Sequence, residues 1–316
     1  MPKEITHWLI ARQVATSLKG TALGDVASDF PNCVKLGAII HDAPYYARNR
    51  RWEKPLLHFA DVMHGRGIDP FASIKSITEA AATAHHPGPI RAMVIGMLTH
   101  IAADSCFHPL VYHETGNYHD PDPAKRSHAV QLHRRFETTL DVYLAGTLTN
   151  IRTFSLKRIM RCCELDVSTL LHEAFTTSAV GFSCPQLPYG LLHSLKIFRH
   201  MQSLYTMPVI PHVLESLHAM LPGSAREITA LFYLPGCVKQ APGLHGPRSV
   251  PDPETGTTRS SSILELYDEA IQLSLRLCRE LEPALLGTAP FNAPQTNIQP
   301  DCATQPDTKT PEHTYA

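Results

Sequence analysis

The sequence predicts an all-α protein built as a multi-helix bundle. Apolar residues recur at helical spacing along most of the chain, and no segment alternates apolar and polar residues as a half-buried strand would. Breaker-rich stretches such as HHPGP at 85–89 and YHDPDPAK at 118–125 separate the periodic segments. With 43% hydrophobic and 18% charged residues over 316 positions, the chain can bury a large core.

Helices are predicted wherever the helical spacing of apolar residues persists. In chain order they cover residues 5–19, 72–84, 89–107, 125–148, 155–181, 187–206, 209–221, 224–234 and 261–286. Residues 1–150 are predicted as a helical core and 151–286 as a helical continuation that packs on it. Residues 287–316 contain too few apolar groups to offset the entropy of ordering, so they are predicted as a disordered tail.

Charge and cysteine content exclude several classes of protein. A net charge of -1 gives no basic field for nucleic acid, so no nucleic-acid partner is expected. The first twenty residues carry charges throughout, and no run reaches the roughly 18 apolar residues of a membrane span. We therefore expect no transmembrane segment and a cytoplasmic location. The eight cysteines form no CxxC pair, so a thiolate zinc finger is not indicated.

Histidine is concentrated in the first half of the chain. Twelve of the 19 histidines fall between His7 and His133, which favours a metal site with nitrogen and oxygen ligands. THIAADSCFHP at 99–109 places His100, Asp104 and His108 four residues apart, on one helical face, and His133 and Glu137 share that spacing. Chance alone gives about 1.7 such His–acid pairs, and the chain has two, so spacing by itself does not indicate a site.

The order of five short motifs is more specific than any one of them. From the N-terminus they are THWLIA, LGAIIHDAPYY, LLHFAD, HIAADSCFHP and HRRFETTLD. In this order they resemble the zinc-dependent phospholipase C family, whose pattern is an early TH, a G-x3-PD turn, an HF dipeptide, an H-x3-D helix leading to HP, and an H-x3-[ED] helix. The resemblance spans roughly residues 5–145, and it implies that the bundle encloses a multinuclear zinc site.

The resemblance implies a role for each matching residue. One zinc would be held by Asp42, His58, His100 and Asp104. A second would be held by His108, His133 and Glu137, and a third by His7 with Asp104 bridging. Asp42 is also the candidate catalytic carboxylate. Two or three zinc ions, with water activated by the metal, would then hydrolyse the phosphodiester of a phospholipid or a related phosphoester, with peripheral membrane contact expected.

The sequence departs from the family pattern at three places. His41 replaces the proline before Asp42, and we interpret it as a helix-end residue rather than an extra ligand. His108 follows Asp104 by two residues fewer than in secreted relatives, so its ligation requires the helix to continue. No N-terminal tryptophan is present, so the third zinc would need the Pro2 amine after removal of Met1. Other nearby histidines are interpreted as surface, capping or supporting groups: His64, His85, His86, His113, His119 and His128.

Three alternatives remain at this point. The His41–Asp42 doublet resembles that of HD-type phosphohydrolases, with His7 and Asp104 as further ligands, although this interpretation leaves four of the polar residues unexplained. A nuclease or nucleotidase on the same scaffold is a second alternative. The third is a non-catalytic helical binding protein that keeps zinc for stability.

Overall fold

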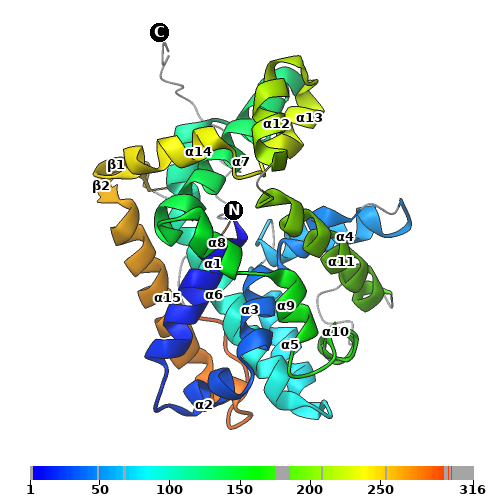
Figure 1. Cartoon of the computed structure of the whole chain (residues 1–316). Helices are drawn as coiled ribbons and strands as arrows, with labels where there is room; N and C mark the ends of the chain where they lie inside the picture. Colours follow the sequence, from blue (N-terminus) through cyan, green and yellow to red (C-terminus); the bar gives the residue numbers. More distant parts are fainter. Residues whose placement is uncertain are drawn as a thin grey trace.

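The computed structural model confirms the all-α bundle and describes residues 3–47, 50–66, 69–175, 186–207, 209–252, 255–294, 298 and 300. Figure 1 shows the helices packed around α3 and α6 at the centre of the molecule. The first half contains α1 (Glu4–Ser17), α2 (Ala22–Asp29), α3 (Pro31–Ile40), η1 (Ala43–Tyr46), α4 (Arg50–Met63), α5 (Ala72–Thr83), α6 (Pro87–Thr115) and α7 (Pro123–Ala145).

The second half is also mainly helical. It contains α8 (Leu148–Thr153), α9 (Leu156–Arg161), α10 (Val167–Phe175), α11 (Leu187–Tyr205), α12 (Val209–Leu217), η2 (His218–Met220), α13 (Gly223–Thr229), α14 (Pro235–Gln240), η3 (Ala241–Leu244), β1 (Pro247–Pro251), β2 (Thr258–Ser262) and α15 (Ile263–Leu285). The single helix predicted over 155–181 is divided into α9 and α10. The division has a local cause, since the Asp166 side chain accepts the Thr169 amide at 3.1 Å and starts a new helix.

An antiparallel hairpin of β1 and β2 lies where the sequence indicated a connection. Its strands, PRSVP and TRSSS, have no apolar alternation, so periodicity could not identify them. Val250 and Ser261 are buried, and the other residues are partly or fully exposed.

Helix α6 is the central element of the core. It runs unbroken for 29 residues, and 83% of its most apolar window is buried inside the bundle. Among the described residues, α6 alone has the length and hydropathy that a membrane crossing would need, and its burial is that of a core helix.

Two glycines let α3 and α6 cross with their backbones in contact. A Cβ on Gly37 would lie 1.9 Å from the carbonyl oxygen of Met93, and a Cβ on Gly96 would lie 2.0 Å from that of Val34. Any larger side chain would force the helices apart. The close crossing brings the end of α3 against the polar face of α6.

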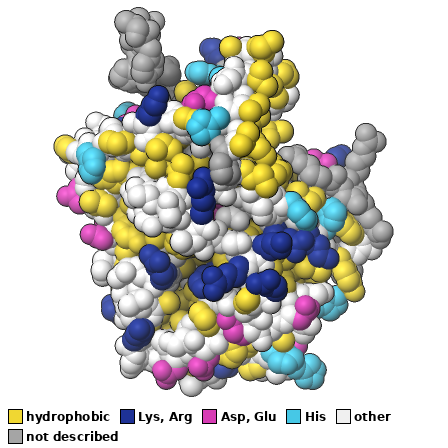
Figure 2. Space-filling view, viewed as in Figure 1, with side chains coloured by type: hydrophobic (Ala, Val, Ile, Leu, Met, Phe, Trp, Pro, Cys, Tyr) yellow, Lys and Arg dark blue, Asp and Glu magenta, His cyan; other side chains and the backbone are white. Residues whose placement is uncertain are grey.

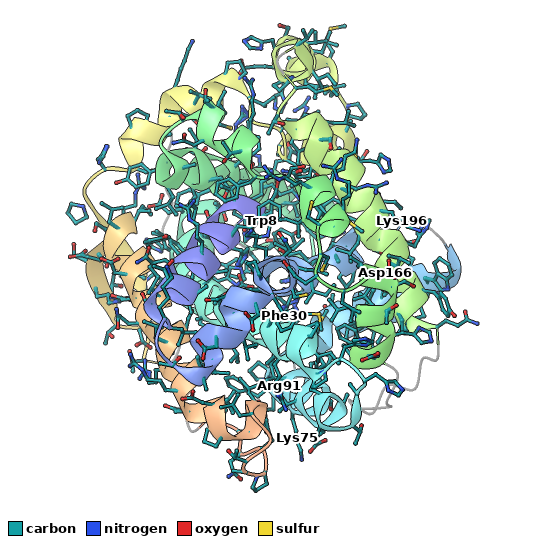
Figure 3. The ribbon with its side chains drawn as sticks, turned by 60° about the horizontal axis from the view of Figure 1, so that its bottom comes forward. Trp8, Phe30, Lys75, Arg91, Asp166 and Lys196 are labelled. Atoms are coloured by element: carbon teal, nitrogen blue, oxygen red, sulfur yellow. The ribbon has the colours of Figure 1, made fainter. Side chains whose placement is uncertain are left out.

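Helix α1 is fixed at its N-terminus by a buried carboxylate on α7. Asp141 accepts the backbone amide of Thr6 at 2.8 Å and its hydroxyl at 2.7 Å, and the hydroxyl of Tyr233 at 2.7 Å. Burial raises the pKa of Asp141 to about 7. Two residues further on, Trp8 (labelled in Figure 3) is fully buried, and its ring N–H donates to the Lys35 carbonyl at 2.9 Å.

The chain after α15 folds back on the bundle before residue 301. Gly287 has φ +75°, the left-handed conformation that ends a helix, and Thr288 donates to the Pro283 carbonyl. Phe291 packs on the core, and Ile298 and Pro300 are buried. The predicted disordered tail therefore includes segments packed on the bundle, while residues 301–316 lie outside the described part of the chain.

Candidate metal centre

The polar face of α6 lies at the centre of the bundle, where histidines and carboxylates from four other segments converge on it. We call two groups of these residues the first and second clusters. The first cluster comprises His7, Asp42, His64, His100 and Asp104; the second comprises His108, His133 and Glu137. All eight side chains are buried, and within each ligand group found there the donor atoms lie within 4.8 Å of one another.

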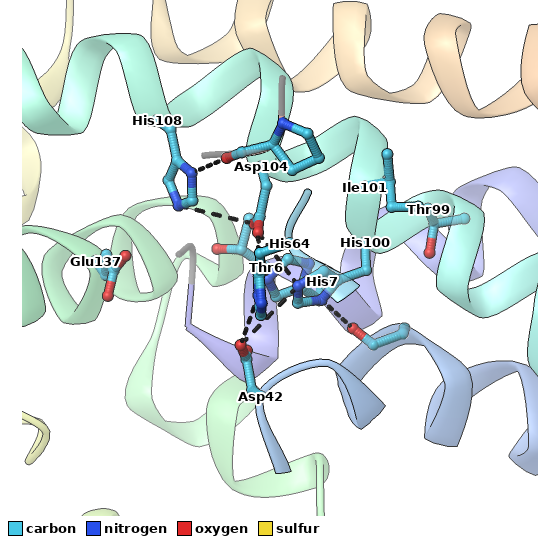
Figure 4. Close-up of polar contacts among 12 residues, drawn as sticks. Thr6, His7, Asp42, His64, Thr99, His100, Ile101, Asp104, His108 and Glu137 are labelled. Carbon is cyan, nitrogen blue, oxygen red and sulfur yellow. Dashed lines mark hydrogen bonds and ion pairs between the residues drawn. The ribbon is translucent and has the colours of Figure 1, made fainter. Parts of the chain in front are cut away.

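Asp104 is the hub of the first cluster (Figure 4). Its Oδ2 lies 3.2 Å from Nε2 of His100 and 3.8 Å from Nε2 of His64. Its Oδ1 lies 3.6 Å from Nε2 of His7. One carboxylate thus faces imidazoles from α1, α6 and the turn after α4.

Asp42 completes the first cluster from the turn after α3. Its Oδ1 lies 3.6 Å from Nε2 of His64 and 3.9 Å from Nε2 of His100. Two carboxylates on two segments therefore face the same pair of imidazoles, an arrangement suited to one cation between them.

The second cluster joins α6 to α7. His133 and Glu137, one helical turn apart on α7, are 2.8 Å apart between Nε2 and Oε1. His108 connects this pair to the first cluster, because its Nε2 lies 4.0 Å from Oδ1 of Asp104. Helix α6 continues through Pro109, so the four-residue spacing keeps His108 on the same face as Asp104, as its predicted ligation requires.

Backbone carbonyls fix the orientation of three of the histidine rings. Nδ1 of His100 donates to the Ala38 carbonyl at 2.9 Å, and Nδ1 of His64 donates to the Ala60 carbonyl at 2.7 Å. Nδ1 of His108 donates to the carbonyl of Pro300, in the segment that follows α15 (Figure 4). A carbonyl can only accept, so each ring donates its Nδ1 proton to the backbone and turns Nε2 toward the clusters.

The first cluster has the donor atoms of a cation site. Both oxygens of Asp104, Oδ1 of Asp42, and Nε2 of His64 and of His100 are buried and make no hydrogen bond within the described part of the chain. Leaving so many buried polar atoms without hydrogen bonds is costly unless a cation binds them. Neutral imidazoles and carboxylates are ordinary zinc ligands, so the residues fit zinc.

Charge within the first cluster shifts its pKa values strongly. Burial disfavours the His100 imidazolium, but the Asp104 and Asp42 carboxylates outweigh it and raise the pKa of His100 to about 9. Burial would raise the pKa of Asp104, yet the surrounding imidazoles, His100 first, lower it well below its usual value. Burial lowers the pKa of His7, which is therefore neutral. The Asp104 carboxylate thus remains charged and attracts cations.

A cavity of about 360 Å³ opens onto both clusters. One side is lined by Asp42, His64, His108, His133 and Glu137. The facing wall is apolar and aromatic and comes largely from α11 and from α13 with the residues that follow it: Ile197, Phe198, Met201, Tyr205, Ile228 and Leu231. A polar, ligand-rich wall therefore faces an apolar wall across the same space.

Comparison with protein families agrees with this geometry. The profile described as zinc dependent phospholipase C matches residues 6–180, which is more than half of the chain and includes every residue of both clusters. The chain belongs to the zinc-dependent phospholipase C family. No curated protein and no solved structure gives a significant match.

The family resemblance assigned His58 to the first zinc, whereas in the structure His64 is the histidine that faces Asp42 and Asp104. Leu56, Phe59, Ala60 and Met63 form the buried face of α4, whereas His58 lies on its exposed side. His64 directly follows that buried face and reaches Asp42 and Asp104. The helical period of α4 places His64, and not His58, on the side that faces the core.

The structure brings the remaining predicted residues together. His7, Asp42, His100, Asp104, His108, His133 and Glu137 all lie in the two clusters. Met1 and Pro2, on which the predicted N-terminal amine ligand depends, lie outside the described residues.

His41, which replaces the family's proline, supports the first cluster from the side. It occupies the cap position at the end of α3, is buried, and stacks on His100 with ring centroids 4.3 Å apart. His7 stacks on His100 as well, at 4.0 Å. His41 belongs to none of the ligand groups, as the helix-end interpretation predicted.

Proposed function

We propose that this protein is a zinc-dependent phosphoester hydrolase that cleaves the phosphodiester of a phospholipid or a closely related molecule. The observation that carries the proposal is the Asp104 carboxylate, which faces imidazoles of both clusters and has both oxygens buried without a hydrogen bond. Such a carboxylate is suited to bridging cations. Membership of the zinc-dependent phospholipase C family supports the same reaction.

The proposed ligands follow the two clusters. Asp42, His64, His100 and Asp104 would hold one zinc, and His108, His133 and Glu137 would hold a second next to Asp104. His7, with Asp104 bridging, would contribute to a third. When bound, zinc supplies a Lewis acid for the phosphoryl oxygens and lowers the pKa of a bound water.

Asp42 is the carboxylate that can receive a proton during the reaction. It lines the cavity and is 8% exposed, whereas Asp104 is fully buried and does not line it. Of the two carboxylates in the first cluster, Asp42 is therefore the one open to a water in the cavity; Glu137 also lines the cavity but is paired with His133 at 2.8 Å. We propose that Oδ2 of Asp42 accepts the proton of the attacking water while the clustered histidines keep its Oδ1 in place.

The cavity walls support an amphiphilic substrate. Ile197, Met201 and Leu231 on the apolar wall suit an acyl chain. Arg134, next to His133 on α7, also lines the cavity, and its Nη1 donates to the Glu227 carbonyl at 2.9 Å. Its other guanidinium N–H groups suit a phosphate oxygen.

The test combines metal analysis of the purified protein with a substrate panel of phosphatidylcholine, phosphatidylglycerol, a nucleotide and single-stranded DNA. We expect two or three zinc ions per chain, hydrolysis of phospholipid, and loss of hydrolysis after chelation that zinc restores. Zinc without hydrolysis of any phosphoester would contradict the proposed reaction and support the zinc-stabilised binding protein. One or two ions of mixed identity with nucleotide hydrolysis would support the HD-type alternative, against which the position of His41 argues.

A further inference from the structure

Exposed apolar side chains are concentrated in one segment of the surface. Ten large apolar side chains are exposed among the described residues, and six of them lie between Met207 and Ile228. Val209 is 70% exposed and Met220 is 81% exposed. Figure 2 shows these yellow side chains gathered over α12 and α13, whereas single exposed apolar residues elsewhere are ordinary.

Helix α12 carries part of this exposed apolar surface on one side and is held to the bundle by the other. Val209, Val213 and Leu217 are four residues apart, so they share one side of the helix, and all three are exposed. Ile210 and Leu214, on the other side, pack on the core. The carboxylate of Glu215 also accepts the Gly236 amide at 2.7 Å, which ties α12 to α14.

The apolar surface continues into the wall of the cavity. Ile228 is 41% exposed and also lines the cavity, together with Leu231 from the same segment. Ile197 and Met201 of α11, which packs against α12, extend that wall. The exposed apolar surface and the apolar wall of the cavity therefore share Ile228, so a lipid docked on this surface would lie beside the cavity.

Basic side chains lie on the same face of the molecule. Lys157, Arg158 and Arg161 of α9 and Lys196 of α11 are exposed, and these two helices pack on each other. Figure 2 shows dark blue side chains below the apolar surface in the same view. Basic groups beside an apolar face are the combination that binds an anionic lipid surface.

We propose that the exposed side of α12, with Met207 and Met220 at its ends and the basic side chains of α9 and α11 beside it, docks on an anionic phospholipid bilayer. The inference rests on the proposed function, since the docked lipid is the source of the substrate. A bilayer is favoured over a protein partner because the apolar surface adjoins the cavity, where a lipid taken from the membrane would meet the ligand-bearing wall.

The test is vesicle flotation of the full-length, zinc-loaded protein with vesicles of equal parts phosphatidylcholine and phosphatidylglycerol. Val213→Ser combined with Leu217→Ser should weaken binding by about 100-fold, because two large apolar groups no longer enter the lipid. Hydrolysis of vesicle lipid should fall in parallel, while hydrolysis of a monomeric short-chain phosphatidylcholine stays unchanged. Leu264→Ser, at a 53% exposed position on α15, is the matched control and should change neither.

Charge is tested separately from apolar contact. Lys157→Glu with Arg161→Glu should weaken binding to the anionic vesicles by at least about tenfold and leave binding to pure phosphatidylcholine unchanged. Equal loss on both vesicle types, or no loss on either, overturns the anionic part of the proposal. If the double serine variant has a lowered melting temperature, Met220→Ser replaces it.

Three results would overturn the docking surface. They are a wild-type protein that does not float, a serine variant that floats like the wild type, and self-association of the wild type that the serine variant abolishes. The failure of the docking proposal can be distinguished from the failure of the proposed function. Vesicle binding through α12 without hydrolysis of any phosphoester contradicts only the proposed function, whereas hydrolysis of monomeric lipid without vesicle binding contradicts only the docking.

Discussion

Helices α6 and α15 are the two long helices that pack against each other in the core, and they bury very different side chains. Helix α15, with 23 residues, buries apolar groups and one serine whose hydroxyl donates to the Ala270 carbonyl at 2.6 Å. Helix α6 buries His100, Asp104 and His108 along one face, and the Asp104 carboxylate makes no hydrogen bond there. The buried Ser274 of α15 is satisfied within its own helix, whereas Asp104 of α6 keeps two buried oxygens without a hydrogen bond, as expected of a metal ligand.

The largest effect is expected from Asp104→Asn on α6. Asparagine keeps the shape but removes the charge next to both clusters, so we expect zinc content and phosphoester hydrolysis to fall by more than about 100-fold. Metal analysis and steady-state kinetics measure the two losses. Ser274→Ala on α15 is the control and should leave both unchanged; substantial activity in the Asp104 variant would contradict the assigned difference between the helices.

The second prediction tests which histidine, His64 or His58, lies against the polar face of α6. His64→Asn should remove a ligand from the first cluster and lower zinc content by about one ion per chain, with a large loss of activity. His58→Asn should change neither, because His58 lies on the exposed side of α4. The reverse order of effects, read by metal analysis of the two variants, would restore the assignment made from the HF dipeptide.

The third prediction concerns the segment that leads from the end of α15 back to α6. A chain ending at Pro294 loses the Pro300 carbonyl that holds Nδ1 of His108, so zinc affinity should fall by about 10- to 100-fold. Competition with a chromogenic chelator measures this affinity. A chain ending at Ala303 keeps the Pro300 carbonyl as an amide carbonyl and should bind zinc like the full-length protein; equal affinity of both truncated chains would show that the contact is dispensable.

The smallest effect on the site is expected from the core side of α15. Leu277 is fully buried, so Leu277→Ala should lower the free energy of unfolding by about 2–5 kcal/mol. Zinc content and kcat per folded molecule should be unchanged, because α15 contributes no residue to either cluster. Denaturant titration measures the loss, and Leu264→Ala at the exposed side should cost less than about 0.5 kcal/mol.

Helical periodicity predicted the helical architecture but not every element, since α2, α3, α4, α8 and α14 lie outside the predicted segments. It predicted most of the helices, because an apolar stripe repeats with the helical period whatever the stripe packs against. It missed the break between α9 and α10, where the Asp166 side chain starts a new helix, and the β1–β2 hairpin, whose strands lack alternation. Local capping and pairing decided those elements.

The candidate site likewise has one part that the sequence predicted and another that it could not predict. Spacings of four residues on one helix predicted His100, Asp104 and His108 on one face, and His133 with Glu137 on another, because these relations depend on a single helix. The choice between His58 and His64 required the side of α4 that faces the core. The contact from Pro300 to His108, 192 residues away in sequence, had no local signal.

By itself, the sequence determined an all-helical chain and the set of histidines and carboxylates carried at helical spacing. Only the tertiary structure decided that His64 meets Asp42 and Asp104, that α11 forms the facing wall of the cavity, and that α12 leaves an apolar side exposed beside it. The physical reason is the distance along the chain over which the deciding interactions act. Backbone periodicity is fixed by neighbouring residues, whereas the position of one helix against another follows from packing across the whole core.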